Sequence, residues 1–162
     1  MTLSVYEVLQ GLGIAYTLHE HEAAFTVEQA RRIYGHLPGA HCKNLFLRNK
    51  KGDRHYLAVV EAAKRVDLRA LRQALGERSL TLASPERLLA HLRLTPGSVT
   101  PFGLIHDTAR AVRVVVDQDL LREPLLNFHP DRNTATLAVS GADFRRFLAH
   151  CGNEVRVVEI PA

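Results

Sequence analysis

Residues 44–62, NLFLRNKKGDRHYLAVVEA, decide the fold. Two largely apolar runs, 44–49 and 55–62, lie on either side of a polar turn at 51–53. Apolar and β-branched runs separated by a short segment that contains glycine are typical of a β-hairpin. We therefore expect two antiparallel strands in this part of the chain.

Helix signals recur on both sides of the hairpin. Each predicted helix begins after a residue whose side chain can accept a hydrogen bond from a free backbone N–H group of the first turn. The predicted starts are Ser4, Thr26, Asp67, Ser84 and Ser140, and the predicted ends are Gly11 or Gly13, Gly35, Gly76, Leu94 and Gly152. A short helix is expected near Leu120.

The remaining apolar segments predict strands. They are YTLHEHEA (16–23), LTLAS (80–84), LIHD (104–107), VRVVVD (112–117), LNFHP (126–130), TATLAVS (134–140) and VRVVEI (155–160). Because hairpins coexist with helical crossovers, the fold class is α/β with a mixed, largely antiparallel curved sheet flanked by helices.

Size and composition limit the function classes. The chain of 162 residues suffices for one domain, 1–162, with a real core. No apolar stretch reaches the ~18 residues of a membrane span, and the N-terminus carries no secretion signal. Two cysteines, Cys42 and Cys151, are too few for a disulfide framework, so we expect a cytoplasmic protein. The net charge of +4 is a weak indication of a polyanionic partner.

Three segments carry residues suited to chemistry. Lys43, with Asn44, precedes the apolar run and places an ammonium where the chain enters the core. The loop Gly97-Ser98-Val99-Thr100-Pro101-Phe102-Gly103 can direct several N–H groups at one oxygen, as in an oxyanion hole. Asn127, Phe128 and His129 are followed closely by Thr134. Each segment taken singly also has a purely structural explanation. Lys43 can be a surface lysine, the glycine loop a plain connector, and the third segment a structural turn.

Together the segments HCKNLFLRNKKG, LTPGSVTPFGLIHD and NFHPDRNTATLAVS resemble those of the YbaK/ProX aminoacyl-tRNA deacylases, which are relatives of the prolyl-tRNA synthetase editing domain. The resemblance runs from near the N-terminus to about Gly152 and is strongest to the branch that removes alanine from proline tRNA. It implies hydrolysis of the aminoacyl ester in trans by water, without metal or cofactor.

The resemblance also implies roles for individual residues. Lys43 would bind the phosphate or ribose at the tRNA terminus, and the Gly97–Gly103 loop would hold the aminoacyl carbonyl. Asn44, Phe102, Asn127, Phe128 and Thr134 would contact the substrate. His129 would contact the amino group or shape the wall, and a general-base role for it ranks below positioning. The expected partners are proline tRNA and, less directly, prolyl-tRNA synthetase, with the protein acting as a monomer.

Several alternatives remain open at this point. Cys42 beside Lys43 is a conceivable nucleophile, although a small buried hydrophobe is the better interpretation. His19, His21 and His41 could bind zinc but lack a supporting motif. A basic track for the acceptor stem is expected from Arg31, Arg32, Lys50, Lys51, Lys64, Arg65 and Arg69. The other functional candidates are a deacylase for serine, threonine, cysteine or a non-protein amino acid, and a non-catalytic tRNA- or synthetase-binding module.

Overall fold

The predicted hairpin is present and organises the sheet. The computed structural model describes residues 3–162, and within them strand β2 pairs antiparallel with β3 from Cys42↔Glu61 to Arg48↔His55. The strands are β1 (Thr17–Glu20), β2 (Ala40–Arg48), β3 (His55–Glu61), β4 (Thr81–Leu82), β5 (Val112–Asp117), β6 (Leu125–Phe128), β7 (Ala135–Ser140) and β8 (Val155–Val158).

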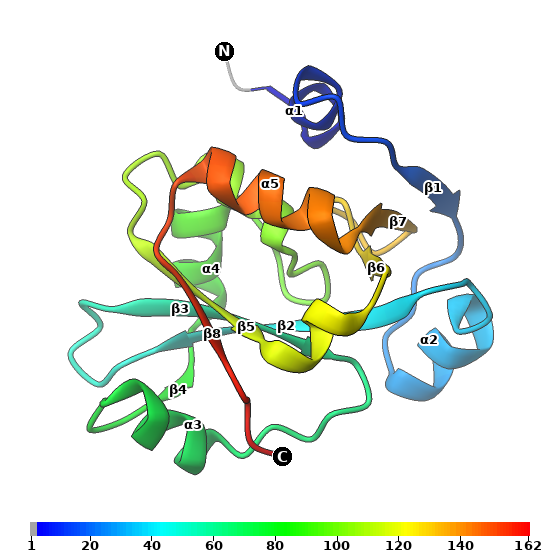
Figure 1. Ribbon diagram of the computed structural model, residues 1–162. Coiled ribbons are helices and arrows are strands. Elements are labelled where there is room, and N and C mark those ends of the chain that lie inside the picture. The colour runs from blue at the N-terminus through cyan, green and yellow to red at the C-terminus, as the bar shows by residue number, and fades with distance from the viewer. Residues whose placement is uncertain (1–2) are drawn as a thin grey trace.

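Within residues 3–162 the eight strands form one sheet in the order β1-β7-β6-β2-β3-β5-β8, with β4 also paired to β2. Four of the strand pairs are antiparallel and three are parallel, which confirms the mixed, largely antiparallel sheet. Figure 1 shows helices on both sides of the sheet. They are α1 (Val5–Gly11), α2 (Val27–Tyr34), α3 (Leu68–Leu75), α4 (Pro85–Leu92), α5 (Gly141–Cys151) and the 3₁₀ helices η1 (Pro101–His106) and η2 (Gln118–Arg122).

Two apolar clusters hold the layers together. Alternate residues of β3 point to opposite faces, so Leu57 and Val59 join the larger cluster while Tyr56 and Val60 join the smaller one. Helices α1, α4 and α5 pack on the larger cluster, and α3 packs on the smaller one. Because both of its faces are covered, β3 is buried from His55 to Val60.

The predicted helix starts are confirmed by their caps. The side chains of Ser4, Thr26, Asp67, Ser84 and Ser140 each accept a hydrogen bond from the backbone N–H three residues later. Gly76 and Gly152 end their helices with φ angles of 71° and 77°, a conformation that glycine adopts without steric cost. Local chemistry therefore sets most of the helix boundaries.

The strand predicted at 104–107 is not formed. Residues Pro101–His106 are instead a 3₁₀ helix, because Thr100 caps its first turn and Pro101 supplies a helical φ angle. Asp107 then turns the chain, since its carboxylate accepts hydrogen bonds from the N–H groups of Ala111 and Val112. Strand β4 is also shorter than predicted, with only two residues.

Besides β3, strand β2 pairs with a different strand at each of its two ends. At its start, Ala40 and His41 pair in parallel with β6, whereas near its end Leu47 and Arg48 pair with β4. Between these two pairings, the edge of β2 away from β3 has no strand partner within residues 3–162. The gap in the ladder lies beside Lys43 and Asn44, so the fold leaves room for a cleft there.

At the other end of the hairpin, a buried histidine is enclosed by cations and aromatic rings. His55 is 4% exposed, stacks on Phe46 and lies 4.1 Å from the ring centroid of His91. Arg87 donates from Nη1 to His55 Nε2 over 3.2 Å, so this nitrogen carries no proton. Burial, with the nearby positive groups, lowers the pKa of His55 to about 4.

No helix within residues 3–162 combines the length and the apolar character needed to cross a membrane.

Candidate functional site

A cleft of about 480 Å³ opens where β2 leaves β6. One wall is α2 with the segment before it, and the opposite wall is formed by Gly97 and Val99 of the predicted loop. The floor comes from the start of β2, the end of β3 and the end of β6. The structure therefore brings together parts of all three segments that the sequence indicated.

Lys43 lines this cleft and is partly buried. Its ammonium makes no ion pair or hydrogen bond with any group of residues 3–162. Burial lowers the pKa of Lys43 below its ordinary value, and the charge of Glu61 acts in the opposite direction. A partly desolvated ammonium without a protein partner is suited to bind an anionic or carbonyl oxygen of a ligand.

The surroundings of the Cys42 thiol do not favour its use as a nucleophile. Burial raises the pKa of Cys42 to about 12, so the group stays protonated and weakly reactive at neutral pH. Its sulfur packs against the larger apolar cluster. The interpretation of Cys42 as a small hydrophobe accounts for both observations.

Only the first half of the glycine-rich loop reaches the cleft. Gly97 has a φ angle of 90°, and its N–H and that of Val99 donate to no acceptor within residues 3–162. Asn44 holds this half in place, because its side-chain amide donates to the Val99 carbonyl over 3.2 Å. Two unused N–H groups on a fixed turn can stabilise a negatively charged oxygen.

The second half of the loop is part of the core. Phe102 is fully buried and packs edge-to-face against Phe128 and Phe147. The contact with substrate that we expected from the sequence is therefore not possible for this ring. Pro101 and Gly103 are also buried, and a Cβ atom on Gly103 would lie 2.6 Å from Leu94 Cδ1. These three residues anchor the loop and do not line the cleft.

Ser98 and Thr100 also lie outside the cleft wall. Ser98 is buried and its N–H donates to the Thr95 carbonyl over 3.1 Å. The Thr100 side chain is fully buried and caps η1. Thr134 is likewise occupied, because its hydroxyl accepts a hydrogen bond from Arg132 over 2.8 Å. The expected contacts of these three residues with substrate have no support in the geometry.

The last two residues of β6, Asn127 and Phe128, and the next residue, His129, line the cleft. Asn127 donates from its side-chain amide to the Pro38 carbonyl over 2.8 Å, which fixes the chain just before β2. Phe128 separates the cleft from the larger apolar cluster. His129 Nδ1 lies 2.9 Å from the Ala135 carbonyl, which can only accept, so the proton is on Nδ1. The other ring nitrogen, Nε2, is then an acceptor.

Burial is also the main reason that the pKa of His129 is lower than usual, with a smaller contribution from the charge of His21. The imidazole is therefore neutral at physiological pH. A neutral ring with a free acceptor nitrogen can orient a water molecule or a hydroxyl group in the cleft.

Some cleft residues gave no sequence signal. Tyr34 on α2 lies between His41 and His129, with ring centroids 6.0 and 5.9 Å apart, and burial raises the pKa of its phenol. Glu61 also lines the cleft, and Arg31, which the sequence indicated only as a member of the basic track, lines it as well. They come together only through packing between distant segments, so spacing along the chain could not reveal them.

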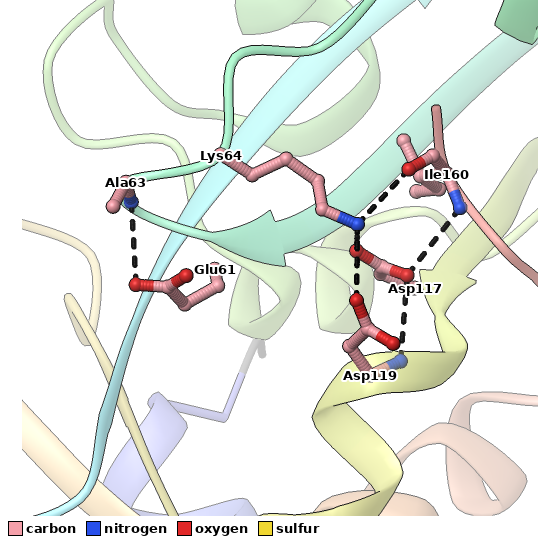
Figure 2. A network of polar contacts seen from close by, with 6 residues as sticks. All are labelled: Glu61, Ala63, Lys64, Asp117, Asp119 and Ile160. Atoms are coloured by element: carbon pink, nitrogen blue, oxygen red, sulfur yellow. Dashed lines mark hydrogen bonds and ion pairs between the residues drawn. The ribbon is translucent and has the colours of Figure 1, made fainter. Parts of the chain in front are cut away.

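The predicted basic track is interrupted. Figure 2 shows the Lys64 ammonium enclosed by Asp117, Asp119 and the Ile160 carbonyl, at distances of 2.5, 3.2 and 2.9 Å. It is therefore not available to a phosphate. Lys50 and Lys51 lie at the hairpin turn, at the opposite end of β2 from the cleft. The members of the set that remain exposed without these constraints are Arg31, Arg32, Arg65 and Arg69.

Two of the three histidines considered as zinc ligands are held by other groups. His21 contacts the Glu22 carbonyl and the Thr136 hydroxyl, each at 2.8 Å, and His41 Nε2 donates to the Leu37 carbonyl. Within residues 3–162, no three side chains of the metal-binding types are grouped so that they could hold a metal ion.

Comparison with known proteins connects this cleft to one family. Residues 21–147 match the family model of the aminoacyl-tRNA editing domain. The chain is 36% identical to the prolyl-tRNA editing protein ProX of Acetoanaerobium sticklandii, over 97% of this chain and 96% of that protein. It is 40% identical to prolyl-tRNA synthetase associated domain-containing protein 1 of Danio rerio, over 88% of this chain and 78% of that protein.

The fold is also shared with solved structures. A crystal structure described as a candidate trans-editing enzyme for prolyl-tRNA synthetase superposes with a TM-score of 0.73 at 24% identity, covering 100% of this chain and 99% of that one. At this level of identity the superposition shows that the fold is the same.

Proposed function

Because the chain belongs to the aminoacyl-tRNA editing family and is an aminoacyl-tRNA deacylase, we propose that it hydrolyses the ester bond of alanyl-tRNA(Pro) in trans. The matches to prolyl-tRNA editing proteins support a role in clearing mischarged products of prolyl-tRNA synthetase. Family membership also sets aside the non-catalytic binding module considered from the sequence alone.

One observation carries the proposal: Lys43, Gly97 and Val99 line the same cleft, and neither the Lys43 ammonium nor the backbone N–H groups of Gly97 and Val99 have a hydrogen-bond partner within residues 3–162. Ester hydrolysis passes through a tetrahedral intermediate whose oxygen becomes negative, and preorganised donors stabilise that charge. In our proposal Gly97 and Val99 hold the carbonyl oxygen. Lys43 binds the terminal phosphate or ribose.

Water is the proposed nucleophile, because the one thiol that lines the cleft stays protonated. The cleft is large enough for a nucleoside with a small acyl group attached. His129 Nε2 is placed to accept a proton or a hydrogen bond from that water or from the neighbouring ribose hydroxyl. Positioning of this kind lowers the barrier by holding the reacting groups together.

Selectivity for alanine over proline would come from the size of the acyl pocket. A synthetase site for proline cannot strongly reject a smaller amino acid, since a missing methylene is worth about 1–3 kcal/mol. A second site that excludes proline corrects the error.

The test is a deacylation assay with proline tRNA charged with alanine, cysteine, serine or proline. We expect alanine to be released fastest and proline to be retained. Preferential release of serine or cysteine would replace the proposed substrate, and failure to release any of the four would refute the proposed reaction.

A further inference from the structure

The cleft contains one carboxylate, and its presence needs an explanation. Glu61, the last residue of β3, is the single acidic residue among those that line the cleft in the described chain. The substrate end of a tRNA is polyanionic, so an unpaired carboxylate there repels phosphate. Such a charge favours binding if the ligand also brings a cation.

Glu61 has no strong protein partner. It forms no ion pair with any residue of 3–162, and its one side-chain hydrogen bond, from the Ala63 N–H, is long at 3.4 Å. Figure 2 shows its carboxylate beside Ala63, turned away from the Lys64 ammonium. One carboxylate oxygen is therefore free to accept hydrogen bonds from a ligand.

Strand pairing places Glu61 at the floor of the cleft. Glu61 pairs directly with Cys42 in the β2–β3 ladder, next to Lys43. Its negative charge raises the pKa values of both Cys42 and Lys43, as expected for a carboxylate near these two residues. On the other side of β2, Asn127 contributes a buried side-chain oxygen, Oδ1, that has no donor within residues 3–162.

An aminoacyl ester carries one cation at its reacting end, the α-ammonium, whose ordinary pKa is about 7.7–8.0. We propose that Glu61 binds the α-ammonium of the aminoacyl group and so selects esters of α-amino acids over other esters of tRNA. This inference rests on the proposed deacylase function and assigns to it a specificity-determining residue. Lys43 would then bind the terminal phosphate or ribose of the substrate, and Glu61 would bind the α-ammonium of the same substrate.

The experiment compares two acyl groups that differ at one position. Alanyl-tRNA and lactyl-tRNA, prepared from it by nitrous acid deamination, share the ester and the methyl group, but lactyl-tRNA has a hydroxyl in place of the amine. Wild type, Glu61→Gln and Glu154→Gln are assayed for kcat/KM on both. Glu154 is a matched control, because it is an exposed carboxylate that pairs with Arg113 outside the cleft.

We expect Glu61→Gln to lower kcat/KM for alanyl-tRNA about tenfold, as for loss of one charge-assisted hydrogen bond, and to change lactyl-tRNA less than about twofold. Binding of uncharged tRNA should be unchanged or tighter, since a negative charge is removed. Glu154→Gln should match wild type on both substrates.

An equal loss on both esters would overturn the inference, because it would indicate a general-base or structural role for Glu61. No loss on either ester would overturn it as well. If the wild-type protein released neither acyl group, the proposed function itself would fail, and this outcome is distinct from the other two. Activity on lactyl-tRNA also verifies that the variant is folded.

Discussion

Replacing Lys64 by methionine should destabilise the protein far more than removing a typical surface cation. The ammonium is 2.5 Å from Oδ2 of Asp117, whose side chain is fully buried, and that oxygen has no hydrogen-bond donor other than the ammonium within residues 3–162. Methionine keeps the length of the stem but leaves the carboxylate without its counter-charge. Breaking a buried pair by removing one partner costs about 3–5 kcal/mol of the free energy of unfolding.

The same network contains its own control. Asp119 binds the same ammonium over 3.2 Å, but its side chain is 51% exposed. Exposed pairs contribute about 0–1 kcal/mol, so Asp119→Asn should cost less than about 1 kcal/mol. Adding Asp117→Asn to Lys64→Met should recover part of the loss, because the buried charge is then removed.

Urea unfolding followed by circular dichroism measures these differences, provided that the slope m is the same in all variants. If Lys64→Met costs no more than Asp119→Asn, the buried pair does not stabilise the fold in the way argued here. If the double variant is as unstable as Lys64→Met, the penalty does not come from the charge on Asp117.

Other predictions concern pH and the cleft. Burial lowers the pKa of His55 to about 4 in the folded protein, against an ordinary value of 6.5, so protonation favours the unfolded chain. The free energy of unfolding should therefore fall by up to about 3 kcal/mol as the pH drops from 6.5 to 4. Urea titrations at several pH values should show a smaller loss for His55→Gln. Lys43→Ala should lower the deacylation rate about 10- to 10²-fold, as for loss of one charge-assisted hydrogen bond to the substrate, whereas Cys42→Ala should keep most of it; the reverse order would invalidate the assigned roles. Gly97→Ala would bring its Cβ only into ordinary contact with Asn133, but the φ angle of 90° strains an alanine, so the loop should shift and activity should fall. Gly103→Ala should lower the melting temperature because its Cβ meets the core.

Most of the fold follows from local signals. Caps such as Ser4 and Ser140 act within one turn, so the residues that set these helix boundaries are adjacent in the chain. The segment 104–107 was misassigned because its apolar character fits a strand equally well. Its 3₁₀ conformation depends on Thr100 and Pro101, which precede the segment, and on packing against α1 and α4.

The site was only partly predictable. Lys43, Gly97, Val99 and His129 were identified through the combined pattern of three segments, and the structure places all four on the cleft. The sequence pattern could not show which half of the glycine loop lines the cleft, since residues in both halves carry the same main-chain N–H group. Glu61 was missed because a glutamate at a strand end is ordinarily just solvated.

The wall formed by α2 has a consequence for how this protein can change. Every residue of α2 from Val27 to Tyr34 keeps some solvent exposure, although the helix borders the cleft. Substitutions there sacrifice little core packing, so most of them fall in the range of ordinary surface changes, about 0.5 kcal/mol or less. Natural variation can therefore reshape this side of the cleft while the scaffold remains intact, so the choice of ligand can change without loss of stability.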